Sequence, residues 1–102
     1  MQALETYGLN KRNTQIIFGI FNKYSEIKNV LIFGSRAKGI FHKGSDVDLA
    51  IESDSVTSKT LRQIKSDFEE SNLPYSVDLL DFNTLNNIPL KEHIQRVGKT
   101  IY

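Results

Sequence analysis

Two short stretches decide how this chain folds: VLIFGS at residues 30–35 and DVDLAI at residues 46–51. The first is a continuous apolar run that Gly34 ends abruptly, which is typical of a central strand covered on both faces. The second alternates with a period of two, as a strand with one apolar and one polar face does. We therefore expect two strands joined by a loop.

Helical spacing of apolar residues surrounds these strands. Apolar side chains recur at three- and four-residue steps over residues 16–27, 61–68 and 90–97, so three helices are predicted there. The expected caps and stops are Asn10 or Asn13 for the first helix, Ser55 or Thr57 for the second, and Pro89 and Gly98 at the ends of the third.

The stretch SVDLLDF at residues 76–82 has the pattern of a third strand. The order is then helix, strand, loop, strand, helix, strand, helix. The economical architecture is an α/β fold of the α+β type, with a small mixed sheet of three to four strands and helices on one face. No repeat or linker divides the chain, so residues 1–102 are expected to form a single domain.

Composition excludes several classes of protein. The chain has 102 residues, 39% of them hydrophobic and 25% charged, which argues against a disordered chain or a membrane protein. Without cysteine, neither a disulfide nor a thiolate zinc site can form. A net charge of +1 predicts no direct binding to nucleic acid, and the first residues lack a signal peptide's pattern. The composition predicts a small cytoplasmic domain.

Two carboxylates emerge from one face of the second strand. Asp46 and Asp48 are two residues apart, so their side chains lie side by side. At a separation of about 4 Å and an effective dielectric near 20, their repulsion is roughly 4 kcal/mol. A fold tolerates this if water screens the pair, as on a solvated edge strand, or if a cation bridges it. Mg²⁺ suits the second case because it prefers oxygen ligands and is often shared with substrate phosphates.

A candidate phosphate-binding turn precedes these carboxylates. Gly34 permits close approach of a ligand to the backbone, and Ser35 can present its hydroxyl and free N–H groups to an anion. Arg36 and Lys38 add positive charge, although a plain strand-to-helix turn with solvated charges would look the same. The turn is not a Walker loop, because Ile40-Phe41 stands where Lys-Ser/Thr is required, and no G-x-G-x-x-G occurs.

Taken together, the blocks FGSRAKG at 33–39, GSDVDLAI at 44–51, VDLLD at 77–81 and IQRVGKTIY at 94–102 resemble a known pattern. They are similar to the DNA polymerase β-like nucleotidyltransferase superfamily. More narrowly, they resemble the minimal nucleotidyltransferases (MNT domains) that act as antitoxins to HEPN-domain toxins. The resemblance spans nearly the whole chain, and the first three of these blocks, in this order and spacing, are far more specific than any one of them.

The resemblance implies a role for each matching residue. Gly34 and Ser35 would hold the β- and γ-phosphates of ATP. Asp46 and Asp48 would ligate Mg²⁺, and Asp78 would complete the metal-binding triad and help to activate the attacking hydroxyl. Strand alternation independently favours Asp78 over Asp81, because Val77 and Leu79 are expected to face the core and Asp81 would sit at the strand's end as a cap.

The same resemblance implies a partner. The activity would be transfer of AMP from ATP to a tyrosine of a HEPN toxin, bound in a hetero-oligomer. Relatives with a second, acceptor-binding domain are longer, so the acceptor is expected on another chain. One alternative is a non-catalytic module that neutralises its partner by binding alone, and a second is nucleotide addition to RNA ends.

Three further expectations concern residues outside the motifs. Phe41 could flank an adenine or cover the sheet's edge, and His42 is a loop histidine that either touches phosphate or is solvated. Chain pairing is expected because four large apolar residues fall in terminal or irregular segments: Leu4, Leu9, Ile88 and Ile101.

Overall fold

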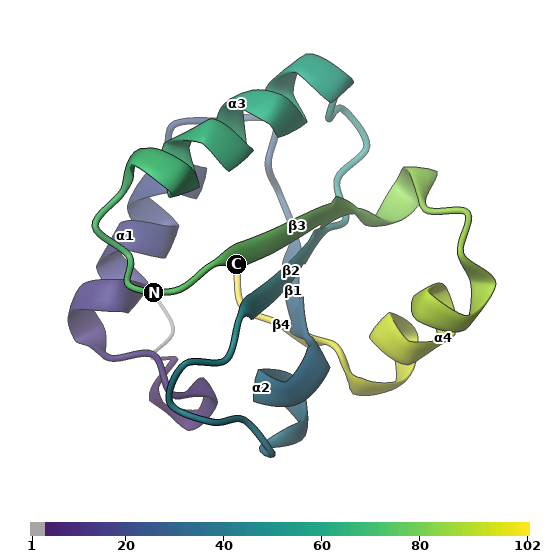
Figure 1. Ribbon diagram of the computed structural model, residues 1–102. Helices are drawn as coiled ribbons and strands as arrows, with labels where there is room; N and C mark the ends of the chain where they lie inside the picture. The colour runs from purple at the N-terminus through teal and green to yellow at the C-terminus, as the bar shows by residue number, and fades with distance from the viewer. Residues whose placement is uncertain (1–3) are drawn as a thin grey trace.

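The computed structural model describes residues 4–102, which form one four-stranded sheet flanked by helices (Figure 1). The elements are η1 (Glu5–Tyr7), α1 (Lys11–Phe21), β1 (Val30–Phe33), α2 (Gly34–Lys38), β2 (Val47–Ile51), α3 (Ser58–Glu70), β3 (Val77–Asp81), η2 (Phe82–Thr84), α4 (Ile88–Val97) and β4 (Lys99–Thr100). The strand order is β3-β2-β1-β4. β2 and β3 are parallel, whereas β1 is antiparallel to both β2 and β4. The predicted α+β class with a mixed sheet is confirmed.

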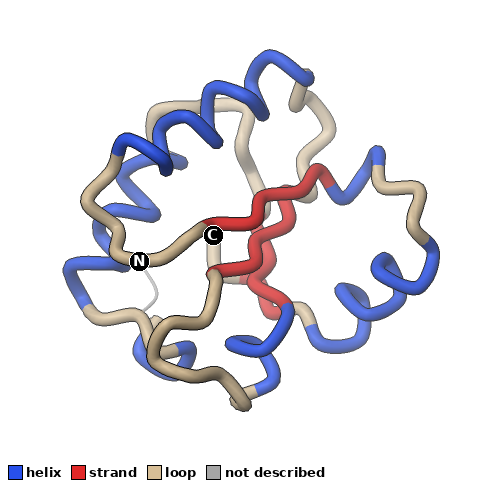
Figure 2. Tube along the Cα trace, viewed as in Figure 1, coloured by secondary structure: helices blue, strands red, loops and turns tan. Residues whose placement is uncertain are grey.

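Helices cover both faces of the sheet (Figures 1 and 2). α1 and α3 pack on one face over the main core, whose central strand residues are Val30, Ile32, Val47, Leu49, Ile51 and Leu79. On the opposite face α4 contributes Ile94 to a smaller cluster with Phe33, Ala50 and Phe82. The expectation that all helices lie on one face was therefore wrong for α4. The apolar alternate positions of β1 and β2 need a cover of their own, and α4 supplies it.

Side-chain caps set the starts of the helices. The Asn10 carboxamide oxygen accepts a hydrogen bond from the Asn13 N–H at 2.8 Å, so Asn10 rather than Asn13 caps α1, which begins at Lys11. Thr57, not Ser55, caps α3 by accepting from the Thr60 N–H at 3.1 Å. α1 ends at Phe21, and the following turns continue the apolar spacing without helical geometry. The caps were predictable, but one buried stripe does not distinguish a helix from the turns that follow it.

The N- and C-terminal segments pack into the main core. Leu4, Leu9 and Ile101 are each at most 2% exposed, whereas the Ile88 side chain is 61% exposed. The argument for chain pairing from these four residues was thus wrong for three of them. Burial of Ile101 follows from β4, a two-residue strand too short to show a period in the sequence. Within residues 4–102 no helix is long and apolar enough to cross a membrane.

Candidate active site

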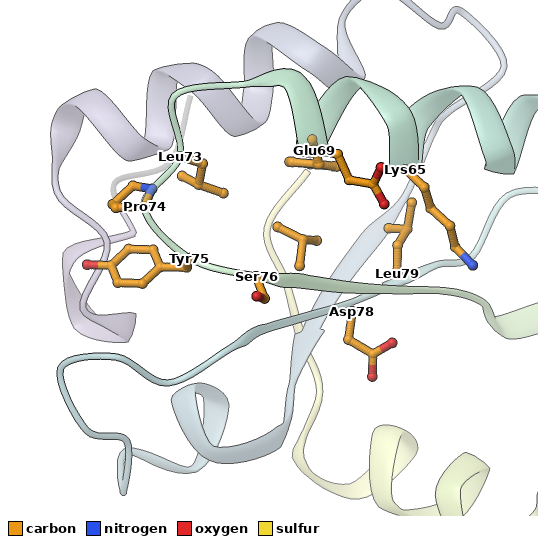
Figure 3. Close-up of a pocket in the computed structure, with 10 residues that line it drawn as sticks. Lys65, Glu69, Leu73, Pro74, Tyr75, Ser76, Asp78 and Leu79 are labelled. Atoms are coloured by element: carbon orange, nitrogen blue, oxygen red, sulfur yellow. The ribbon is translucent and has the colours of Figure 1, made fainter.

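Strand register brings two of the predicted carboxylates together. Asp48 of β2 lies opposite Phe33 of β1 and beside Asp78 of β3. Val47 and Leu49 point into the main core, so alternation turns Asp48 to the opposite face, the one that α2 and α4 flank. Figure 3 shows the Asp78 side chain leaving β3 on the side away from Leu79. The two carboxylates therefore share one face of adjacent strands.

The third carboxylate belongs to the same electrostatic cluster. Asp46, which is exposed, lies immediately before β2. Partial burial of Asp48, followed by repulsion from Asp78 and then from Asp46, raises the Asp48 pKa from 3.8 to about 6. The positive charge of Arg36 opposes this increase. An unneutralised group of three acids is what a cation would stabilise.

The predicted phosphate-binding turn lies against these acids. Gly34 follows β1 directly and has a φ of +72°, a backbone conformation that side-chain-bearing residues rarely adopt. A Cβ atom at this position would fall on the Asp48 carboxylate. Glycine is thus required both for the turn and for the space that the acid occupies. Ser35 follows in α2 and is partly exposed.

Positive charge lies on the α2 and α4 side of the site. Lys38 is exposed at the end of α2. Burial, followed by the charges of Lys38 and Arg96, lowers the pKa of His93 in α4 below its usual value. The His93 ring also packs edge-on against Phe33, with centroids 6.2 Å apart. Lys38 ends the short helix that begins at the Gly34 turn. The packing of His93 against Phe33 could not be predicted from the sequence.

Arg36 lies elsewhere than its predicted position at the phosphate. Its side chain is 1% exposed and, within residues 4–102, donates hydrogen bonds to the backbone carbonyls of Tyr7, Ser45 and Asp46 alone. The Phe41 ring packs on the guanidinium, with 5.2 Å between the central carbon of Arg36 and the ring centroid. No signal in the sequence marks this arginine as buried. His42 is exposed, and its backbone N–H donates to the Ser45 hydroxyl.

Whether these residues could bind a divalent cation depends on the oxygen ligands that their carboxylates offer. Within residues 4–102 no three histidine, aspartate or glutamate side chains form a ready cage for an ion. Mg²⁺ does not require such a cage, because it keeps several waters and takes one or two carboxylates together with substrate phosphates. The neighbouring acids and the adjacent glycine–serine turn fit that mode of binding.

A cleft of about 600 Å³ lies on the other side of β3, between this strand and α3. Its lining includes Lys65, Phe68 and Tyr75, and Asp78 forms part of its rim. Figure 3 shows the Asp78 carboxylate directed away from Lys65 and Glu69, toward the opposite face. The cleft and the carboxylate cluster are therefore separate features that share the edge strand.

Comparison with known proteins adds to this geometry. The family described as "Polymerase beta, Nucleotidyltransferase" matches residues 15–102. A probable protein adenylyltransferase MntA of Haemophilus influenzae is 45% identical over 69 residues, which is 67% of this chain and 60% of the relative. The chain thus matches less than two thirds of that relative's length.

Several solved structures share the fold. A chain of a toxin–antitoxin crystal structure with AMP-PNP superposes with a TM-score of 0.71 at 23% identity, over 88% of this chain and 73% of that one. A chain of the MntA–HepT toxin–antitoxin structure superposes with a TM-score of 0.65 at 19% identity, over 91% of this chain and 72% of that one. A structure described as a nucleotidyltransferase from Sulfolobus solfataricus superposes with a TM-score of 0.53 at 21% identity, over 97% of this chain and 83% of that one. At these identities the likeness concerns the fold alone.

Proposed function

The chain belongs to the polymerase beta nucleotidyltransferase family, and we propose that it transfers AMP from ATP to a hydroxyl group of a partner toxin, as its antitoxin. The observation that carries this proposal is the cluster of Asp46, Asp48 and Asp78 against the Gly34 turn. The MntA relative supports the reaction class, and the toxin–antitoxin structures of the same fold support the antitoxin role.

In the proposed complex, Asp46 and Asp48 ligate Mg²⁺ and Asp78 completes the set. When bound, the metal neutralises charge on the triphosphate and lowers the pKa of the acceptor hydroxyl. Gly34 and Ser35 hold the β- and γ-phosphates through backbone N–H groups and the serine hydroxyl. Lys38, exposed at the end of α2, is the remaining candidate for a charged contact with phosphate.

The transfer step needs positioning rather than a covalent enzyme intermediate. The acceptor oxygen attacks the α-phosphorus in line, a new oxygen–phosphorus bond forms, and the bond to the bridging oxygen of pyrophosphate breaks. Asp78 accepts the proton of the attacking hydroxyl, because its exposed carboxylate lies on β3, the strand at the edge of the sheet. Pyrophosphate leaves with the electron pair of the broken bond, and its phosphates are those that the Gly34–Ser35 turn is proposed to bind.

The acceptor is proposed to be a tyrosine of a HEPN-domain toxin, bound as a hetero-oligomer in the cytoplasm. A neighbouring reading frame that encodes a HEPN protein with an R-x-x-x-x-H element would identify this partner. Direct binding of nucleic acid is not part of the proposal, because the net charge of +1 offers little attraction for a phosphate backbone.

Transfer is tested by incubating the protein with ATP labelled at the α-phosphate, Mg²⁺ and the partner toxin. The partner should gain the label and one AMP-sized mass. Asp78→Asn should abolish this gain, whereas Asp81→Asn should not, because Asp81 caps η2 through the Asn83 N–H at the other end of β3. An unlabelled partner under these conditions would contradict the catalytic proposal.

A second candidate function is neutralisation by binding alone. An Asp46→Asn/Asp48→Asn double variant separates the two, because it removes the proposed metal ligands from the cluster. If this variant still neutralises the toxin in cells as fully as the unaltered protein, the binding module is the better description. Loss of neutralisation with retained complex formation supports the enzyme.

A further inference from the structure

Arg36 is the most buried charged residue of the described chain and contacts several segments at once. Its Nη2 and Nε atoms donate to the Ser45 carbonyl at 2.7 and 3.2 Å, and Nε also reaches the Asp46 carbonyl at 3.3 Å. On the other side Nη1 donates to the Tyr7 carbonyl at 2.8 Å. The guanidinium therefore joins the N-terminal turn to the residues that precede β2.

Aromatic rings enclose the same guanidinium. Its central carbon lies 4.4 Å from the centroid of the Tyr75 ring and 5.2 Å from that of Phe41. A Cβ atom on Gly8 would collide with both Phe41 and Arg36, so the N-terminal turn packs tightly against this group. A planar fork that donates in several directions while stacking on rings is specific to arginine, and lysine cannot reproduce it.

The segments that Arg36 joins are those that carry the proposed site. Arg36 belongs to α2, one residue after Ser35 of the phosphate-binding turn. Asp46 follows the loop of residues 39–45, most of which is exposed. Tyr75 leads into β3 and Asp78. One side chain thus fixes the turn relative to the approaches to two carboxylates.

We propose that Arg36 is a positioning residue that holds Asp46 in place for the divalent cation and so sets the affinity of the site for metal. It acts through the Ser45 and Asp46 carbonyls and touches neither metal nor nucleotide. This inference rests on the proposed function, because it requires a metal at the carboxylates. Groups that orient metal ligands typically change metal affinity by about 10–100-fold when they are replaced.

The test compares Arg36→Lys with the unaltered protein and with Arg62→Lys, an exposed position on α3. Mn²⁺ binding is measured by electron paramagnetic resonance in the presence of AMP-PNP, and unfolding by urea is measured separately. We expect Arg36→Lys to weaken Mn²⁺ binding at least about 10-fold, and Arg62→Lys to leave it unchanged. The Mg²⁺ concentration for half-maximal transfer should rise equally, with the maximal rate recovered at high Mg²⁺.

Unchanged Mn²⁺ affinity in folded Arg36→Lys would overturn the inference, because a purely structural role lowers the folded fraction and not the affinity. If Arg36→Lys does not fold, Phe41→Leu decides, since it removes one stacking ring and leaves the guanidinium. It should weaken Mn²⁺ binding about threefold, and unchanged affinity would overturn the inference. Asp48→Asn distinguishes the two proposals: if it abolishes Mn²⁺ binding while both Arg36→Lys and Phe41→Leu bind normally, only the role of Arg36 fails.

Discussion

At the scale of single residues, Asp48 has conflicting requirements for folding and for the metal binding that we propose. Its carboxylate is partly buried beside Asp78 and Asp46, which raises its pKa to about 6. Folding alone favours the protonated acid, whereas a cation requires the ionised one. Gly34 leaves room for the Asp48 carboxylate, because a Cβ atom on residue 34 would collide with it.

The Asp48 pKa predicts a pH-dependent stability. Between about pH 4 and pH 6 the folded protein holds a proton that the unfolded chain has released, so stability falls as pH rises through this window and stays lower above it. Asp48→Asn removes this titration. Above pH 6, without metal, the variant should be more stable by about 1 kcal/mol, a value discounted for solvent screening, and near pH 4 the two should match.

Urea unfolding of both proteins at pH 4 and pH 7.5 measures this difference. If the two proteins have the same free energy of unfolding at pH 4 and also at pH 7.5, the neighbours of Asp48 do not raise its pKa. Asp54→Asn, an exposed position after β2, is the matched control and should show no such dependence.

A second residue-scale prediction concerns Gly34. Replacement by alanine forces a side chain into the +72° conformation and onto the Asp48 carboxylate. We expect a loss of about 1–3 kcal/mol of unfolding free energy, together with loss of nucleotide binding. Gly19→Ala is the matched control, because a Cβ there meets nothing within 4 Å, and it should stabilise α1 by up to about 1 kcal/mol. Similar thermal midpoints for the two variants would contradict the packing described.

At the scale of elements, the sequence predicted what periodicity and capping chemistry determine. Alternation placed Asp48 and Asp78 on one face, and the register of β2 and β3 agrees with it. Periodicity could not predict β4, which has two residues, nor η1, which has three. The burial of Arg36 was also unpredictable, because its partners are carbonyls and rings from segments far apart in the sequence.

Contacts between elements also carry a prediction. The Tyr24 hydroxyl donates to the Asp67 carboxylate of α3, which Lys23 also contacts at 3.0 Å. The bond from Tyr24 is the main cause of a lowered Asp67 pKa, so this contact stabilises the fold at neutral pH and is lost as pH falls through that pKa. Asp67→Asn should cost a few tenths of a kcal/mol at pH 7 and less in acid.

The same variant has a spectroscopic readout. Burial and the bond to Asp67 raise the pKa of Tyr24 to about 12. Ultraviolet titration of the tyrosines should show this pKa lowered in Asp67→Asn. A Tyr24 titration unaffected by the substitution would show that the two side chains do not interact in solution.

At the scale of the whole molecule, the two faces of the sheet differ in what they carry. The face under α1 and α3 carries the main core, including the terminal residues Leu4 and Ile101. The face under α2 and α4 carries the carboxylates and only a small apolar cluster. Destabilising changes in the first face should lower the folded fraction, whereas changes in the second should alter metal and nucleotide binding in protein that remains folded.

We propose above that Asp46, Asp48 and Asp78, beside the Gly34–Ser35 turn, bind a magnesium nucleotide. Isothermal titration calorimetry with AMP-PNP and Mg²⁺ tests it without a partner. We predict saturable heat for the unaltered protein, dependent on Mg²⁺ and abolished by Asp48→Asn, with Asp54→Asn binding normally. No heat from the unaltered protein, or equal binding by Asp48→Asn, would show that these carboxylates do not bind a magnesium nucleotide.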